Sequence, residues 1–317
     1  MLQLFKSSYE ALRELPLSVP EKGAWLNLIN PKIEELNAAA VITGAPLDFL
    51  RAALDEEERS RTEIEENCLL VITNIPVMRG VDSYDTLPLS IILTPDYIVT
   101  VCLENNRVLS DFCPTNAKYF STFKRTRFLF QLLYKSATYY LTYLKQINKR
   151  TDEIERQLRK SMQNRELFQL MELQKGYTFF SASLRSNGIV LEKLLRLRLN
   201  NQLQHLIKVY EEDEDLLEDV IIENKQAIEM VEMYNHILNG MMDTFASVIS
   251  NNLNMVMKFL ASMTIILSIP TMVASFFGMN VPLPFGLEQS FGFGYILVLS
   301  VTGASVAAFA LWRKDMF

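Results

Sequence analysis

The side chains most able to do chemistry in this sequence form a row near its C-terminus, spaced alternately four and three residues apart. Such spacing averages 3.5 residues, so the row lies on one face of a helix that follows a supercoil axis. Hydroxyl and amide oxygens on that face could line a wet path, whereas small residues equally allow transmembrane helices to pack closely. The row continues toward the N-terminus into serines and an aspartate, which favours the wet path. Its members are Ser275, Thr271, Ser268, Thr264, Ala261, Met257, Asn254, Ser250, Ser247, Asp243 and Gly240.

Two apolar segments must position this row. Phe259–Phe277 has 19 residues and Phe293–Trp312 has 20, both without a charge. Because a bilayer span takes roughly 20 apolar residues, we expect a membrane domain at 251–317. Its spans would lie at about 255–277 and 293–312, joined by a loop at 278–292. Two spans cannot enclose water, so a pore would require a symmetric oligomer with the first spans at its centre.

Basic residues predict the topology. Lys258 precedes the first span, Arg313 and Lys314 follow the second, and the loop between them carries one charge, Glu288. The positive-inside rule then places both termini in the cytoplasm. The first 15 residues show no signal-peptide pattern, and three unpaired cysteines suit a reducing cytosol. We expect a multi-pass protein of the cell (inner) membrane with its polar body in the cytoplasm.

Composition argues against several other functions. The 317-residue chain has a net charge of −6, which argues against a nucleic-acid partner. Its two histidines, His205 and His236, are not clustered with cysteines, as a soft-metal site would need. Phosphate-loop, dinucleotide and HExxH motifs are missing from the sequence. We therefore expect neither an enzyme nor a cofactor.

The distribution of prolines divides the predicted soluble body into two parts. Eight of 11 prolines lie before residue 115 and none lies between residues 116 and 269, which permits long helices. Before that point, β-branched runs predict strands at Cys68–Pro76, Leu89–Leu93 and Tyr97–Leu103, with a turn at Thr94-Pro95-Asp96. Helical patterns flank them at Pro31–Thr43 and Pro46–Glu66. We expect an α/β domain at residues 1–117.

Helices are expected from Tyr119 onward. One runs to about residue 162, and a second, at about Arg165–Leu197, pairs with it in antiparallel fashion. A third begins near Asn200 and continues into the first span. Residues 118–250 would thus hold a helical hairpin and the cytoplasmic part of a long stalk helix. The predicted fold class is an α+β cytoplasmic domain with a long helical stalk and two C-terminal transmembrane helices.

The segment after the first span supplies a family resemblance. Phe276-Phe277-Gly278-Met279-Asn280, placed directly after the first of two C-terminal spans, resembles the CorA family of divalent-cation channels. The proline-free helix and the N-terminal α/β domain extend the resemblance over the whole chain. It implies a funnel-shaped homopentamer in a lipid bilayer. The first span would line the pore and the second would face lipid.

The resemblance also assigns the ion pathway. Mg²⁺ gives up its water reluctantly and prefers octahedral oxygen coordination, so a ring of neutral oxygens can hold the hydrated ion. The implied selectivity filter is Gly278, Met279 and Asn280, where Asn280 supplies a side-chain oxygen and Gly278 permits a tight turn. Asn280 capping a helix end is the plainer alternative. The expected pore-lining residues are Asn254, Met257, Leu260, Thr264, Ser268, Thr271 and Ser275, with Met257 and Leu260 forming an apolar constriction.

In this family, cytoplasmic Mg²⁺ held by acids between subunits closes the pore. Asp243 matches the stalk position, and Asp55 or Glu56 stands nearest to the expected partner position, where Ala52 and Ala53 align. These acids could equally form a solvated helix face. Glu288 and a second acidic cluster could concentrate cations, although a solvated helix tip also accounts for the cluster. Its members are Glu211, Glu212, Asp213, Glu214 and Asp215.

The leading hypothesis is therefore a Mg²⁺ channel that also passes Co²⁺ and Ni²⁺, with Mg²⁺ as transported and regulatory ion. A Zn²⁺ transporter of the related branch is the alternative, and Met279 argues against it because that branch tends to depart from methionine there. A non-conducting membrane scaffold is a third hypothesis.

Overall fold

The computed structural model describes residues 1–8, 11–65, 67–161, 164–197, 206–207, 209–279 and 292–316. It divides into two compact units, Met1–Gly240 and Met241–Phe317.

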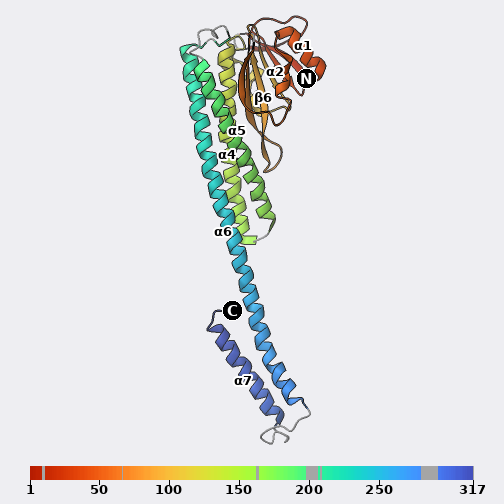
Figure 1. Ribbon diagram of the computed structural model, residues 1–317, viewed down its shortest axis with the longest axis vertical. Helices are drawn as coiled ribbons and strands as arrows, with labels where there is room; N and C mark the ends of the chain where they lie inside the picture. Colours follow the sequence, from red (N-terminus) through yellow and green to blue (C-terminus); the bar gives the residue numbers. More distant parts are fainter. Residues whose placement is uncertain are drawn as a thin grey trace. The chain divides into compact units, whose positions relative to one another are not determined.

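A seven-stranded sheet organises the first unit (Figure 1). Its strand order is β2-β1-β3-β7-β6-β5-β4, and only the β3–β7 pair is parallel. The strands are β1 (Leu2–Ser8), β2 (Ala11–Leu15), β3 (Trp25–Ile29), β4 (Arg61–Glu65), β5 (Cys68–Met78), β6 (Tyr84–Leu93) and β7 (Ile98–Cys102). The two edge strands, β2 and β4, are short and carry charged residues, which discourages pairing with another sheet.

The three predicted strands are present as β5, β6 and β7. They are nearly continuous runs of buried apolar residues because both faces of the sheet are covered. The turn predicted between the last two is also present, since the Thr94 amide donates to the Tyr97 carbonyl at 3.0 Å. The sequence patterns did not reveal β1, β2, β3 and β4.

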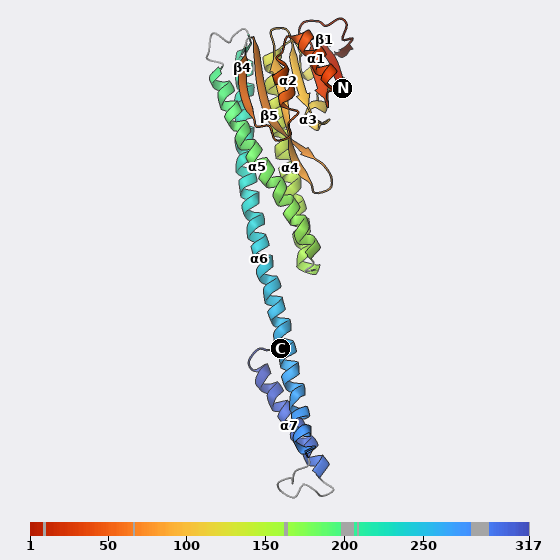
Figure 2. The same ribbon diagram turned by 45° about the vertical axis from the view of Figure 1, so that its right-hand side comes forward.

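Helices cover both faces of the sheet (Figure 2). Helices α1 (Ile33–Thr43) and α2 (Leu47–Ala52) enclose one hydrophobic core. On the other face, α3 (Arg107–Ser110), the 3₁₀ helix η1 (Pro114–Tyr119), α4 (Arg125–Ser161), α5 (Asn164–Leu197) and the start of α6 (Glu211–Phe277) enclose a second core. This unit is thus a three-layer arrangement of helices, sheet and helices.

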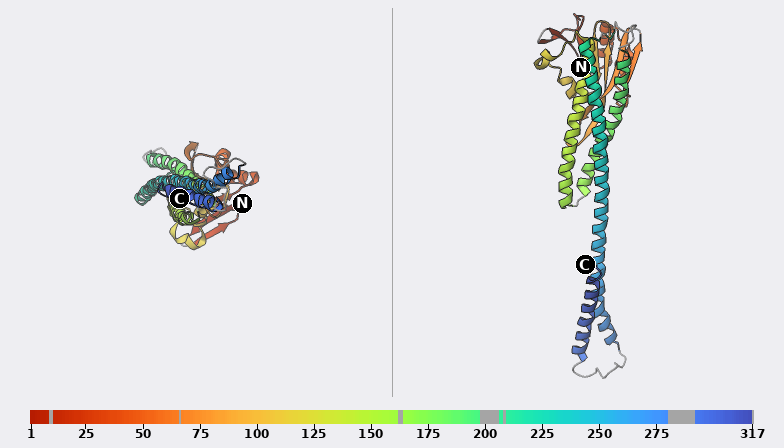
Figure 3. Two further views of the ribbon diagram at one scale, coloured as in Figure 1. Left: turned by 90° about the horizontal axis from the view of Figure 1, so that it is seen from below. Right: turned by 90° about the vertical axis from the view of Figure 1, so that its left-hand side faces the viewer.

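The predicted antiparallel hairpin is confirmed as α4 and α5, which run side by side (Figure 3). Tyr140 and Phe180 join them through an edge-to-face contact with ring centroids 5.0 Å apart. The predicted long helix is present as α6, but it begins at Glu211 rather than near Asn200.

The helix predicted over Pro46–Glu66 is wrong, because α2 ends at Ala52 and β4 occupies Arg61–Glu65. After the helix, the Glu57 amide donates to the Asp55 carboxylate at 3.0 Å. A side chain that binds nearby backbone in this way competes with the helical hydrogen bond. Asp55 and Glu56 therefore lie in a turn and not on a helix face.

The second unit contains the remainder of α6 and α7 (Gly292–Trp312). Both helices are long and apolar enough to cross a membrane. They pack through a small residue, since a Cβ added at Gly303 would lie 3.1 Å from Ile269 Cγ2. The hydroxyl of Ser262 donates to the Met316 carbonyl at 3.1 Å, which fixes the end of α7 against α6.

Candidate functional site

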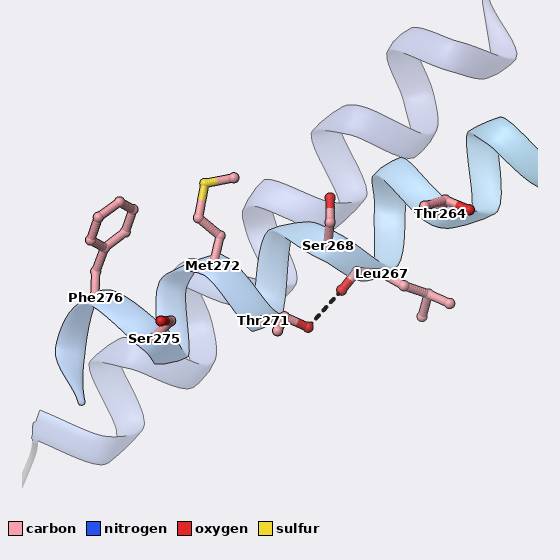
Figure 4. A pocket seen from close by; sticks show the side chains of 7 residues that line it. All are labelled: Thr264, Leu267, Ser268, Thr271, Met272, Ser275 and Phe276. Carbon is pink, nitrogen blue, oxygen red and sulfur yellow. Dashed lines mark hydrogen bonds between the residues drawn. The ribbon is translucent and has the colours of Figure 1, made fainter. Parts of the chain in front are cut away.

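The hydroxyl row lies along a groove on α6 in the second unit (Figure 4). The groove encloses about 620 Å³ and is lined by Thr264, Leu267, Ser268, Thr271, Met272, Ser275 and Phe276. Four of the predicted pore residues, Thr264, Ser268, Thr271 and Ser275, are exposed in the single chain. The structure thus brings them together on one surface.

This row faces away from α7. The less exposed residues of the same helix segment include Ser262, Ile266, Ile269 and Val273, and two of these four contact α7 or the residues just after it. The hydroxyl row is displaced from them by two residues, which is about 200° around a helix with 3.6 residues per turn. Close packing against α7 therefore cannot account for the small residues of the row.

Three hydroxyl hydrogens of the row are already engaged within the helix. Thr264 donates to the Leu260 carbonyl at 2.8 Å, Ser268 to Ile265 at 2.8 Å and Thr271 to Leu267 at 3.1 Å. A hydroxyl oxygen has two lone pairs besides its hydrogen, so these groups offer acceptors to the groove. A surface of acceptors suits partners that donate hydrogen bonds, such as the water molecules around a cation.

The remaining predicted pore residues lie earlier on α6. Asn254, Met257 and Leu260 are exposed in the single chain, Met257 by 59% and Leu260 by 53%. Apolar side chains this exposed near a membrane span favour contact with lipid or with another chain. Their proposed role as a constriction stays a prediction.

The C-terminal end of α6 holds part of the predicted filter. Gly278 closes the helix, with its amide donating to the Ala274 carbonyl at 2.9 Å. A Cβ at this position would lie 3.2 Å from that carbonyl oxygen, so glycine avoids a tight contact. The Met279 side chain is 55% exposed. Asn280 and Glu288 lie outside the described residues.

The predicted regulatory acids belong to different units. Asp243 is exposed on α6 in the second unit, whereas Asp55 and Glu56 are exposed in the first. Glu56 is 4.0 Å from Arg79, at the limit of an ion pair. Among the described residues, no group of three or more His, Cys, Asp or Glu side chains is arranged to hold a metal ion.

The acidic cluster lies at the start of α6, where the positive end of the helix dipole stabilises carboxylates. Asp213 is buried, accepts from the Tyr210 amide at 3.2 Å and pairs with Arg127 at 3.1 Å. Glu212 pairs with the same arginine at 3.2 Å. Glu211, Glu214 and Asp215 complete this cluster. At least Asp213 is thus committed to a structural contact.

Sequence reasoning missed the packing residues of the second unit, Ser262, Ile269 and Gly303. A signal for them was present, because a glycine inside an apolar helix often marks close approach of a neighbouring helix. These three residues define which side of α6 is left free within one chain.

A family model described as "CorA-like Mg2+ transporter protein" matches residues 20–314. The chain is 26% identical over 265 residues to the "Cobalt/magnesium transport protein CorA" of Methanocaldococcus jannaschii. That alignment covers 81% of this chain and 79% of the relative.

Solved structures share the fold. The complete CorA magnesium transporter of M. jannaschii matches with a TM-score of 0.82 and 23% identity, covering 100% of this chain and 99% of that one. The full-length CmaX protein matches with a TM-score of 0.72 and 16% identity over 98% and 96% of the two chains. The ZntB cytoplasmic domain from Vibrio parahaemolyticus matches 79% of this chain and 96% of its own, with a TM-score of 0.59 and 12% identity.

Proposed function

The chain belongs to the family of CorA-like Mg²⁺ transporter proteins, and we propose that it is a homo-oligomeric Mg²⁺ channel of the cell (inner) membrane. The oligomer is a pentamer, as the family resemblance implies. Co²⁺, which the M. jannaschii relative carries in its name, and Ni²⁺ are further permeating ions. The protein is a transporter and not an enzyme.

The observation that carries this proposal is the side of α6 on which the hydroxyl row lies. A row packed against α7 would be closed off within one chain, whereas this one is left for other copies of α6. A cyclic oligomer brings the same surface of each copy around one axis. Rings of hydroxyl acceptors at Thr264, Ser268 and Thr271 would then surround a central path.

These rings suit a hydrated ion. Mg²⁺ dehydrates reluctantly and usually keeps several of its waters, and each bound water donates hydrogen bonds outward. Gly278, Met279 and Asn280 form the filter at the mouth of this path, where Asn280 accepts hydrogen bonds from the ion's waters. Selectivity from rings of oxygens is a general solution in channels.

Charge would drive the ion inward. With Lys258, Arg313 and Lys314 marking the cytoplasmic side, a divalent cation entering at 100 mV gains roughly 4–5 kcal/mol. Glu288 outside and the acidic first turn of α6 inside raise the local cation concentration. Cytoplasmic Mg²⁺ held by Asp243 and by Asp55 or Glu56 of a neighbouring copy closes the pore.

The test is Mg²⁺ influx into liposomes that contain the purified protein, read with an internal Mg²⁺ dye. Hexaamminecobalt outside imitates a hydrated divalent cation whose ligands do not exchange. We expect influx that this complex blocks, and block weakened in the Asn280→Ala variant.

Three other results would change the proposal. Influx that hexaamminecobalt leaves intact would keep the channel but remove the filter for hydrated ions. Zn²⁺ influx without Mg²⁺ influx would establish the Zn²⁺ transporter instead. Influx of neither ion, from protein with an intact melting transition, would leave the membrane scaffold.

A further inference from the structure

A polar pocket in the first unit has no part in the ion pathway. It lies where the start of α4 meets the turn before β3, the turn between β6 and β7, and the segment that leads into α6. The pocket encloses about 470 Å³, within the usual range for small-molecule sites. Its charged lining residues are Lys22, Asp96, Lys124, Arg125, Arg127 and Asp213.

The charges of this pocket do not balance. Four cationic side chains face two carboxylates. Each carboxylate is already paired, Asp96 with Lys22 at 3.0 Å and Asp213 with Arg127 at 3.1 Å. Lys124 and Arg125 remain without an ion pair among the described residues.

Arg125 is the more unusual of the two. Its Nη1 atom is buried and lacks a hydrogen-bond partner among the described residues. Burial lowers the pKa of this guanidinium, and the charge of Asp96 opposes that shift only in part. A buried polar group without a partner destabilises the fold, and more so when it is charged. A ligand that accepts a hydrogen bond from this atom would remove that cost.

Other groups around Arg125 favour an anion as that acceptor. Lys124 is exposed beside it and offers three further donors. Helix α4 begins at Arg125 and runs for 37 residues, so the first amides of a long helix add positive potential here. Guanidinium binds phosphate oxygens in a planar, bidentate manner, which a single ammonium cannot match.

We propose that this pocket binds a phosphate-bearing anion through Arg125 and Lys124. Phosphate of this kind has two sources, inorganic pyrophosphate and a nucleotide. Phe123 distinguishes them, because its ring forms part of the pocket wall and is 73% exposed. A base can stack on that ring, whereas pyrophosphate has no use for it.

The ligand would connect parts of the first unit that are distant in sequence. Arg127, two residues after Arg125, holds Asp213 in the first turn of α6. The amide of Gly23 donates to the Asp96 carbonyl at 2.7 Å and so joins the two turns on the opposite wall. Anion binding therefore tightens the junction between the sheet, α4 and the start of α6.

Isothermal titration of the full-length protein in nanodiscs tests this, with EDTA present so that Mg²⁺ does not bind the phosphates. Pyrophosphate and ADP are titrated separately at physiological salt. Arg125→Gln and Lys124→Gln should each weaken pyrophosphate binding at least tenfold. The matched control is Arg196→Gln, which removes an exposed arginine that lies 3.8 Å from Glu192; its binding should stay within twofold of wild type.

Melting curves decide whether the variants are folded and what Arg125 does without ligand. Because Nη1 of Arg125 is buried without a partner among the described residues, Arg125→Gln should melt no lower than wild type in the absence of anion. If ADP binds more tightly than pyrophosphate and Phe123→Leu removes only that difference, the source is a nucleotide. If Phe123→Leu changes neither ligand, the source is inorganic.

Two outcomes overturn the proposal. One is wild-type protein that binds neither pyrophosphate nor ADP, whatever the melting temperature of Arg125→Gln; a lower melting temperature of that variant would then assign Arg125 to a contact within or between subunits. The other is a loss of pyrophosphate affinity in Arg196→Gln that is as large as the loss in Arg125→Gln and Lys124→Gln. Binding would then reflect general surface charge.

Discussion

Replacing Thr271 by valine isolates the contribution of one hydroxyl ring. Valine keeps the β-branched shape and replaces the hydroxyl with a methyl group. The Leu267 carbonyl that accepts the hydroxyl at 3.1 Å keeps its ordinary backbone partner in the helix, so the fold should be unaffected. The groove loses one acceptor in every copy of the chain.

The size of the effect follows from the number of acceptors that a passing ion would use. A net hydrogen bond is worth about 1 kcal/mol, and a hydrated ion in contact with one or two of the hydroxyls would lose about 1–2 kcal/mol of stabilisation. If this ring is at the highest barrier, Mg²⁺ influx should fall about 5- to 30-fold. The added methyl group makes the ring less wettable, which changes influx in the same direction.

Thr302→Val is the matched control. Thr302 is also exposed in the second unit, and its hydroxyl donates to the Val298 carbonyl at 2.7 Å, but it lies on α7. Both variants therefore lose the same group with the same local hydrogen bond. Liposome influx, normalised to the amount of inserted protein, should fall for Thr271→Val and stay within twofold of wild type for Thr302→Val.

Two results would refute the reasoning. Unchanged influx in Thr271→Val would show that the row does not face the ion path and serves helix packing. Equal losses in both variants would show that removing any hydroxyl from these helices disturbs the membrane domain. Thr264→Val tests the same argument about two helical turns away, where the hydroxyl donates to the Leu260 carbonyl at 2.8 Å.

Further predictions concern closure, packing and pH. Asp243→Ala should raise the cytoplasmic Mg²⁺ concentration needed to stop influx. An unchanged inhibition curve would show that Asp243 has no part in closure. Gly303→Val should lower the melting temperature by an amount that reflects about 1–3 kcal/mol of overpacking, because its Cβ would lie 3.1 Å from Ile269 Cγ2. Adding Ile269→Ala to this variant should restore part of the lost stability. Additive losses in the double variant would contradict the contact. Burial and a hydrogen bond to Asp111 raise the pKa of Tyr139 to about 12. An unfolded phenol loses its proton near pH ~10, so stability should fall as the pH rises from about 10 to about 12; a melting series in which Tyr139→Phe shows the same fall would exclude Tyr139 as its source.

The outline of the fold could be predicted where one local pattern dominated. Buried β-branched runs predicted β5, β6 and β7, and long proline-free amphipathic segments predicted α4, α5 and α6. The edge strands β2 and β4 are short and carry charged residues, so their strand character depends on pairing with a neighbour rather than on sequence. The same lack of pattern led to the wrong helix at Pro46–Glu66.

For the candidate ion path, the hydroxyl row could be predicted from the sequence, because a period of 3.5 residues is a property of one helix. Which side of that helix the row occupies could not, since this depends on where α7 packs through Gly303 and where the residues after it contact Ser262. Likewise, Lys124 and Arg125 are visible in the sequence as neighbours, but their lack of partners is not. Whether the buried Nη1 of Arg125 has a partner depends on what four distant segments bring beside it, and only folding sets those distances.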